Sequence, residues 1–322
     1  MLGRVEEALS PARRRFRNLA WSVLVFNVLV VLGGAIVRAT GSGDGCGASW
    51  PRCTDRLFPA NPGIETVIEF GHRITSALAI FGVVALFLLG RRLYEAGHRV
   101  RRSATASLVL LVFEALLGAA LVLFGWVDQD ASVGRMVIVP LHLVNTYMLV
   151  AALTLTAWWA SGMPPIGRPV DAKVRRRLAL GAAALLTIGA VGALNALSDS
   201  LYPVESFLEG VRAETSADAA WLLRVRLVHP IIAIAFGLWV ASTTTRLAVP
   251  ATEGTKRYAT ILRWLIVVQL LVGASNVLLA VPLELQVVHL AIADAIWIAY
   301  LVFGAALLGE TRTADLPVET AA

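Results

Sequence analysis

Long apolar runs that carry almost no charge recur along the whole chain, and they restrict its fold more than any other feature. A helix that crosses a bilayer needs about 20 mostly apolar residues. Runs of this length occur near 19–38, 67–90, 103–127, 134–160, 177–197, 221–246, 258–281 and 284–309. They are continuous and do not alternate with a period of two, which excludes a transmembrane β-barrel. The sequence therefore predicts an all-α integral membrane protein with eight transmembrane helices.

The composition excludes several other classes of protein. Of the 322 residues, 57% are hydrophobic and 16% are charged, whereas soluble domains have roughly 25% charged residues. A soluble fold of this length could not bury so much apolar surface, and neither a disordered chain nor a secreted scaffold with many disulfides fits. The first apolar run can span a bilayer and no typical cleavage site follows it, so we expect it to stay as a helix.

The basic residues give the predicted bundle an orientation. With eight spans both termini lie on one side, and the loops of that side hold most of the 28 Lys and Arg residues. The positive-inside rule makes this side cytoplasmic. We therefore expect a plasma membrane protein with cytoplasmic N- and C-termini and an external loop over 39–66. The net charge of +6 reflects this topology, so the bilayer is an expected partner and nucleic acid is not.

A short polar pattern occurs once in each half of the chain. In the third run, Glu114 stands four residues before Gly118. In the seventh run, Gln269 stands four residues before Gly273. Residues four apart share a helix face, so each polar side chain shares a face with its glycine. This repetition suggests an internal duplication of a four-helix unit.

The loop lengths agree with such a duplication. Longer external loops over 39–66 and 198–220 follow the first and fifth runs, which would be equivalent in a repeat of four helices. We predict two pseudo-symmetric four-helix bundles, an N-terminal half over 1–160 and a C-terminal half over 177–322. A basic cytoplasmic linker over 161–176 joins them.

Four of the five histidines occupy equivalent places. His72, His142, His229 and His289 lie one on each even-numbered helix, near its external end, whereas His98 lies in a cytoplasmic loop. A histidine inside a membrane is costly unless it is paired or ligated. Each of the four taken alone could be a structural residue that bonds a carbonyl or hydroxyl. Their repetition at similar depth favours a ligand role.

Two histidines per half suit one kind of metal group better than another. Zinc would need three or four close ligands, with carboxylates or thiolates among them. Imidazoles on two facing helices fit the axial ligation of haem iron. The sequence therefore predicts one metal site from His72 with His142 and a second from His229 with His289.

Glu69 lies three residues before His72, on the same helix face and at the external membrane boundary. A carboxylate beside a haem ligand can accept a proton or stabilise a cationic intermediate, which makes Glu69 the candidate catalytic residue. The alternative is a solvated interfacial acid paired with Arg73.

Further candidates surround the predicted ligands. Gly71, Gly118 and Gly273 are expected to let a backbone approach the ring edge, or simply to pack helices. Glu114 is deep enough to need protonation or a cation such as Arg135. The remaining candidates are neighbours of the ligands, a second deep acid, and outer-end arginines suited to haem propionates or to anchoring at the interface: Gln269, Asp294, Arg73, Arg224 and Arg226.

Cys46 and Cys53 form a C-x6-C pair in the predicted external loop. Because the outer face is oxidising, we expect a disulfide between them. It can be a loop staple or a redox-active bond. The chain has no C-x-x-C-H motif, so any haem is held without thioether links.

Three neighbouring stretches resemble the first-loop signature of the haem A synthases. They are Gly33-Gly34-Ala35-Ile36-Val37-Arg38-Ala39-Thr40-Gly41-Ser42-Gly43-Asp44-Gly45-Cys46, then Trp50-Pro51-Arg52-Cys53, then Ile68-Glu69-Phe70-Gly71-His72-Arg73. Gln269 to Leu279, with Pro282 and His289, is similar to that family's seventh and eighth helices. The resemblance covers nearly all of 19–309, and Glu114 stands where it leads us to expect glutamine.

The resemblance implies an activity and partners. It implies a membrane enzyme that converts the C8 methyl of haem O to a formyl group, giving haem A for cytochrome c oxidase. Successive hydroxylations and loss of water from the gem-diol would produce the aldehyde. The expected partners are haem O, haem O synthase and an electron donor, and a homo-oligomer is compatible with the sequence.

The resemblance also implies roles for single residues. The C-terminal pair would hold a haem b cofactor and the N-terminal pair would form the substrate haem site: His229 with His289, and His72 with His142. Glu69 would match the family's functionally important glutamate. Cys46 and Cys53 would match its external cysteine pair.

Three other functions compete with this interpretation. An electron-transfer cytochrome b, for example a quinol dehydrogenase subunit, commonly stacks two haems across the membrane, whereas these histidines all lie near one face. A transporter with inverted repeats would need halves of opposite orientation, which an even helix count does not give. A protein that only carries haem is distinguished from an enzyme mainly by Glu69.

Overall fold

The computed structural model describes residues 9–53, 59, 62–166 and 171–313. Eight of its helices are long and apolar enough to cross a membrane, which confirms the predicted all-α fold with eight spans. These are α2 (Pro11–Ala39), α3 (Ile64–Leu93), α4 (Arg99–Leu123), α5 (Val133–Ala160), α6 (Ala172–Leu201), α8 (Trp221–Ala248), α9 (Glu253–Leu278) and α10 (Leu283–Thr313). The outermost parts of both predicted halves, and residues 167–170 of the predicted linker, lie outside the described residues.

Four of the spans, α2, α4, α5 and α6, begin at a residue whose side chain caps the first turn. The Ser10 hydroxyl accepts from Arg13 N before α2, and Pro11 follows at the first helical position. Asp171 caps α6 in the same way by accepting from Lys173 N. Such caps satisfy amide groups that the helix itself leaves free. The spans are therefore longer than their apolar runs at these ends.

Two predicted helix ends were wrong. The run over 103–127 ends as a helix at Leu123, and the run over 258–281 ends at Leu278. Beyond these points the backbone takes positive φ values, +67° at Gly125 and +56° at Ala280. A left-handed backbone cannot continue an α-helix, so the apolar residues that follow belong to turns.

Two short elements lie in the long loops that follow α2 and α6. A 3-10 turn, η1 (Ser42–Asp44), precedes Cys46, and a nine-residue helix, α7 (Phe207–Thr215), lies between α6 and α8. The Ser206 hydroxyl caps α7 by accepting from Glu209 N. Neither element was predicted, because both are too short to give a clear hydrophobic period.

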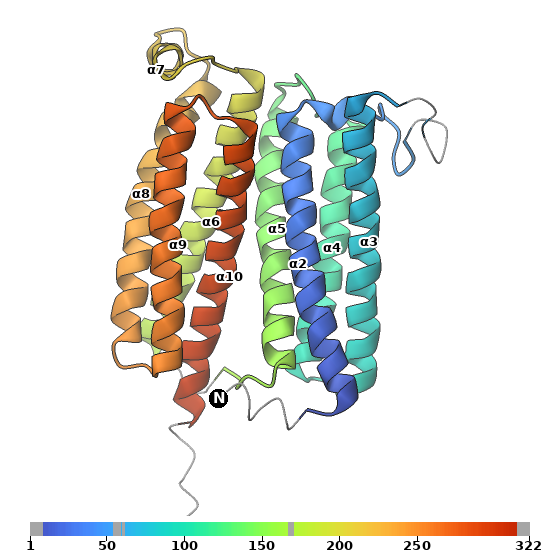
Figure 1. The fold of residues 1–322 in the computed structure, drawn as a ribbon, viewed down its shortest axis with the longest axis vertical. Helices are drawn as coiled ribbons and strands as arrows, with labels where there is room; N and C mark the ends of the chain where they lie inside the picture. The colour runs from blue at the N-terminus through green and yellow to red at the C-terminus, as the bar shows by residue number, and fades with distance from the viewer. Residues whose placement is uncertain (1–8, 54–58, 60–61, 167–170, 314–322) are drawn as a thin grey trace, which may run out of the picture.

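The spans form two groups that stand side by side (Figure 1), α2 to α5 in one and α6 with α8 to α10 in the other. Helices α2, α5, α6 and α10 pack across the boundary between the groups. We call the end with η1 and α7 the disulfide end. The opposite end, where α2, α4, α6 and α9 begin, is the arginine-rich end.

Aromatic side chains fill the boundary between the two groups. Trp297 donates from Nε1 to the carbonyl of Tyr147 at 2.7 Å, and the two rings stack with centroids 5.7 Å apart. Tyr300 donates its hydroxyl to the carbonyl of Leu178 at 2.5 Å. These buried hydrogen bonds join α10 to α5 and to α6. Breaking one would be costly, because a buried donor without a partner loses more free energy than the hydrogen bond itself contributes.

Candidate functional site

The four histidines lie at similar depth near the disulfide end. His72 is on α3, His142 on α5, His229 on α8 and His289 on α10, each within about the first ten residues of its helix. All four side chains are half-buried. The structure therefore gathers them in one layer, while His98, in the turn before α4, lies at the other end.

The helices that carry each pair are diagonal partners. In the first group the close neighbours are α2–α3, α3–α4, α4–α5 and α5–α2, which closes a ring and sets α3 opposite α5. In the second group α6–α8, α8–α9, α9–α10 and α10–α6 close a ring in the same way. The two imidazoles of each pair, His72 with His142 and His229 with His289, lie close enough to repel each other when protonated. Each pair thus faces across the middle of its own four-helix group.

A glycine on the preceding span lies under each imidazole. A Cβ at Gly34 would lie 3.2 Å from His72 Cε1, and one at Gly192 would lie 3.0 Å from His229 Cε1. The distance is 3.1 Å from Gly273 to His289 and a looser 3.9 Å from Gly118 to His142. A Cβ at the closest of these positions would force the imidazole to shift by a few tenths of an ångström, so glycine lets the ring lie against the neighbouring backbone.

The predicted glycines differ in their surroundings. A Cβ at Gly71 would meet nothing within 4 Å, so this residue does not contact the imidazole of His72, and its approach to a haem edge stays a prediction. Gly33 and Gly34 on α2, and Gly192 on α6, were missed. The adjacent pair Gly33-Gly34 inside an apolar run was an available signal, because two glycines in a helix interior are unfavourable without a packing reason.

The donor set of each half is suited to a haem. Among the described residues, Nδ1 of all four histidines is buried without a hydrogen-bond partner. In that part of the chain no three His, Cys, Asp or Glu side chains gather at one point, so each half offers two facing imidazoles. A nitrogen that lacks a partner inside a membrane is costly unless it is ligated. Two opposed imidazoles match axial haem ligation.

Glu114 and Gln269 take equivalent places beside the second histidine of each pair. Glu114 Oε1 lies 3.4 Å from His142 Nδ1, without hydrogen-bond geometry. Gln269 Nε2 lies 3.2 Å from His289 Nε2, in hydrogen-bond contact. Since each residue precedes its glycine by one helical turn, α4 and α9 both supply a polar group and a glycine to one imidazole.

Of the two alternatives given for Glu114, the pairing with Arg135 is wrong. Arg135 donates to the carbonyls of Asp128 and Asp130, at 2.6 and 2.8 Å, in the turn before α5. Glu114 instead accepts hydrogen bonds from two side chains of α5, Asn145 at 2.6 Å and Thr146. Neutral donors thus hold its carboxyl group against the helix that carries His142.

Glu69 binds the disulfide loop to α3. Its side chain is buried, with only 3% exposed, and Oε2 accepts from the backbone N–H of Cys46 at 2.7 Å. Oε1 accepts from Arg73, whose Nη1 also donates to the carbonyls of Ser49 and Arg52 at 2.6 Å. Cys46 and Cys53 form the expected disulfide. Glu69 does pair with Arg73, but it is buried in a network that closes the loop above His72, and it is not a solvated interfacial acid.

We expect Glu69→Ala to make the Cys46–Cys53 disulfide easier to reduce. The substitution removes the acceptor for Cys46 N–H and leaves the half-buried guanidinium of Arg73 without its carboxylate partner. The rate of maleimide labelling after mild reductant should rise several-fold. Glu65→Ala, at an exposed position in the first turn of α3, is the matched control and should label like wild type. Equal labelling of all three proteins would show that Glu69 does not hold the loop.

The arginines near the disulfide end that were candidates for haem propionates form ion pairs and hydrogen bonds within the protein. Arg226 pairs with Asp199 at 2.8 Å and donates to the carbonyls of Ser198 and Tyr202. Glu214 on α7 lies 4.0 Å from Arg226. Burial raises the pKa of Glu214, and Arg226 opposes this effect. Arg224 is exposed and donates to the carbonyl of Ala217 at 3.3 Å.

Arg38 links the two groups and was missed as a site residue. It extends from the end of α2 to α6, donating to the Ala196 carbonyl at 2.5 Å and the Ser200 hydroxyl at 2.6 Å. Its second terminal nitrogen donates to Gln286 Oε1 of α10 at 2.9 Å. An arginine at the end of an apolar run was the available signal, but its partners come from distant parts of the chain.

Asp294 lies at the boundary between the groups, away from the histidine pairs. It is 1% exposed, and among the described residues neither carboxyl oxygen has a hydrogen-bond partner. It interacts electrostatically with Tyr147 of α5. The structure therefore separates this deep acid from His289, five residues earlier on α10.

Fold and site together define a multi-pass helical membrane protein with a facing histidine pair in each of two four-helix groups. Residues 17–301 match the model of the COX15-CtaA family, whose description is cytochrome oxidase assembly protein. The chain belongs to this family, and the resemblance seen in the sequence is confirmed.

Individual relatives carry two different names. Over 292 residues the chain is 46% identical to a protein of Thermus thermophilus named protoheme IX farnesyltransferase, covering 90% of this chain and 48% of the relative. A heme A synthase of Alkalihalophilus pseudofirmus is 38% identical over 128 residues, 40% of each chain. A heme A synthase of Bacillus cereus is 41% identical over 112 residues, 34% of this chain and 36% of the relative. The chain thus spans about half the length of the Thermus relative.

Proposed function

We propose that the protein is a haem A synthase that oxidises the C8 methyl of haem O to a formyl group. The observation that carries this proposal is the facing histidine pair in each of two four-helix groups, in a member of a cytochrome oxidase assembly family. Relatives named heme A synthase support it. Two haem sites side by side suit a reaction in which one haem is substrate and the other a redox partner.

The two pairs take different roles in this proposal. His229 and His289 hold a haem b cofactor, which supplies electron transfer when bound, and Gln269 orients His289. His72 and His142 hold haem O as substrate. Each of two hydroxylations would convert a C–H bond of the methyl carbon to C–OH, with molecular oxygen as oxidant and with two protons and two electrons from the electron donor, releasing one water. The gem-diol formed by the second hydroxylation would lose water to give the aldehyde.

The loop closed by the Cys46–Cys53 disulfide is the reason for assigning the first histidine pair to the substrate. Glu69 and Arg73 close the Cys46–Cys53 loop one helical turn above His72. Substrate must enter and product must leave, and a loop bonded through two side chains can open without disturbing the spans. In this role Glu69 positions the loop at the entrance through its bonds to Cys46 N–H and Arg73.

The electron-transfer cytochrome remains the alternative function. Electron transfer across the bilayer needs haems near both membrane faces, yet all four histidines lie near the disulfide end. This arrangement favours chemistry under one face. The positive-inside rule makes that face external, with both termini in the cytoplasm.

The Thermus relatives support a partnership with haem farnesylation. Proteins named protoheme IX farnesyltransferase contain a stretch 46% identical to this chain within about twice its length. Farnesylation of protohaem is the class of reaction that supplies haem O. We propose that this chain works beside such an enzyme and receives its product. Farnesyl transfer by this chain itself is the second candidate function, because the Thermus relatives are named protoheme IX farnesyltransferase.

Mass spectrometry of extracted haems tests these functions together. Membranes that contain the protein and a haem O synthase should accumulate haem A, whereas membranes with the synthase alone should contain haem O. Unaltered haem O beside well-folded protein would overturn the oxidising function. The protein expressed without the synthase should leave protohaem unfarnesylated, and farnesylated haem in that sample would favour the second candidate.

A further inference from the structure

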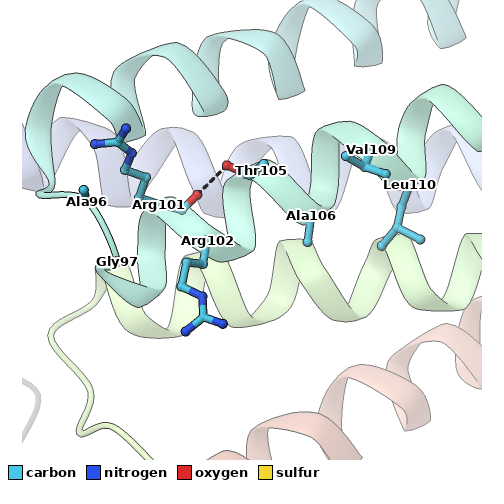
Figure 2. A pocket seen from close by; sticks show the side chains of 8 residues that line it. All are labelled: Ala96, Gly97, Arg101, Arg102, Thr105, Ala106, Val109 and Leu110. Atoms are coloured by element: carbon cyan, nitrogen blue, oxygen red, sulfur yellow. Dashed lines mark hydrogen bonds between the residues drawn. The ribbon is translucent and has the colours of Figure 1, made fainter.

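An open groove of about 610 Å³ runs along the outer side of α4 at the arginine-rich end. Figure 2 shows the side chains that line it, beginning in the turn before α4 and following one stripe of the helix. We call it the α4 groove. Its mouth is formed by Ala96, Gly97, Arg101 and Arg102, and its floor by Thr105, Ala106, Val109 and Leu110.

The α4 groove changes from cationic to apolar along its length. Arg101 and Arg102 lie in the first turn of α4, where the positive end of the helix dipole adds to their charge. Val109, two turns further into the span, is 50% exposed. Thr105 donates its hydroxyl to the Arg101 carbonyl at 2.8 Å, so its polar group is turned back onto the helix and the floor stays apolar.

The guanidinium groups of Arg101 and Arg102 extend to opposite sides of the α4 groove (Figure 2), and both are available to a ligand. Within the described parts of the chain, neither Arg101 nor Arg102 has a carboxylate or carbonyl partner. The neighbouring Arg99 stacks over the ring of Trp159, 5.9 Å from its centroid. Guanidinium groups bind phosphate through paired hydrogen bonds that a simple ammonium cannot match.

The surroundings of the α4 groove determine which kind of molecule can bind in it. The buried face of α4 carries Val100, Ala104, Ser107 and Leu111, so the groove lies on the opposite side, toward the bilayer. Its floor runs into an apolar span, where only a molecule with a long apolar part fits. The histidine pairs lie at the other end of the spans, so the groove belongs to neither of them.

We propose that the α4 groove binds an anionic phospholipid, with its phosphate on Arg101 and Arg102 and an acyl chain along Ala106 and Val109. Basic clusters where a span meets the cytoplasmic leaflet attract anionic headgroups, and the apolar floor adds affinity that a free anion lacks. The proposal is independent of the proposed enzymatic function.

Lipid retention tests the site in purified protein. Native mass spectrometry after extraction from mixed vesicles of phosphatidylglycerol and phosphatidylcholine should show phosphatidylglycerol retained selectively. Arg101→Gln with Arg102→Gln should reduce its retention by up to about 30-fold, since each basic side chain near a membrane surface contributes about fivefold. The matched control is Arg175→Gln with Arg176→Gln, two exposed arginines in the first turns of α6 that do not line the groove. It removes the same surface charge, so it should reduce retention clearly less than the Arg101 and Arg102 double variant does.

Two further measurements separate a lipid site from general surface charge. Ala106→Phe fills the floor without changing any charge, and it should also lose phosphatidylglycerol. Glycerol 3-phosphate, which has the charge but no acyl chain, should not raise the Tm of the wild-type protein. Equal loss in both arginine double variants, full retention in Ala106→Phe, or stabilisation by glycerol 3-phosphate would each overturn the proposal.

Discussion

Purified His229→Ala and His289→Ala proteins are expected to lose the low-spin b-type spectrum that the proposed function assigns to the wild type. Each substitution removes one of two imidazoles that face each other across the second four-helix group. The iron would then keep a single protein ligand, which cannot maintain the low-spin state. Haem content per protein, measured as the pyridine haemochrome, should fall strongly in both variants, and any haem that remains in the second group should lack the low-spin bands.

The control for these variants is His98→Ala. His98 accepts from Val100 N at 3.2 Å in the turn before α4, at the end of the molecule that carries no other histidine among the described residues, so its loss should leave the haem content unchanged. Imidazole added to His229→Gly should restore part of the low-spin spectrum, because the deleted ring leaves space for it. A full haem complement in either alanine variant would show that the cofactor is not held by this pair.

The sequence predicted the features of the fold and site that depend on a single span. Each apolar run had to become a helix, because a bilayer leaves the backbone no other way to satisfy its hydrogen bonds. The four histidines stood out because an ionisable side chain is costly there. Both inferences need only the residue and its immediate neighbours, which is why the spans and the layer of histidines were found without the structure.

What the sequence could not predict depends on how distant segments meet. Glu69 was expected beside a ligand, but its bond to Cys46 N forms only when the loop folds back over α3. The glycines under the imidazoles lie on the preceding span, for example Gly34 under His72, so the contact depends on how two helices pack. Arg38 finds acceptors more than 150 residues away, and no local pattern indicates them.

The glycines under the histidines lead to the second large effect. Gly192→Val and Gly273→Val are expected to remove the haem from the second group almost as completely as loss of a ligand. A Cβ would already lie 3.0 Å from His229 or 3.1 Å from His289, so two further methyl groups force the imidazole away from its partner. The corresponding alanine variants should show partial loss, since the ring needs to move only a few tenths of an ångström.

Gly71→Val is the matched control, because it makes the same substitution in a helix beside a histidine while its Cβ meets nothing within 4 Å. Both substitutions carry the same change in helix propensity, so a difference in haem content isolates the contact with the ring. The measurement is haem per folded protein, with folding followed by circular dichroism. If Gly192→Val and Gly71→Val retained equal haem, the close approach of backbone and imidazole would not be what positions the ligand, and the four glycines would serve only to pack the helices.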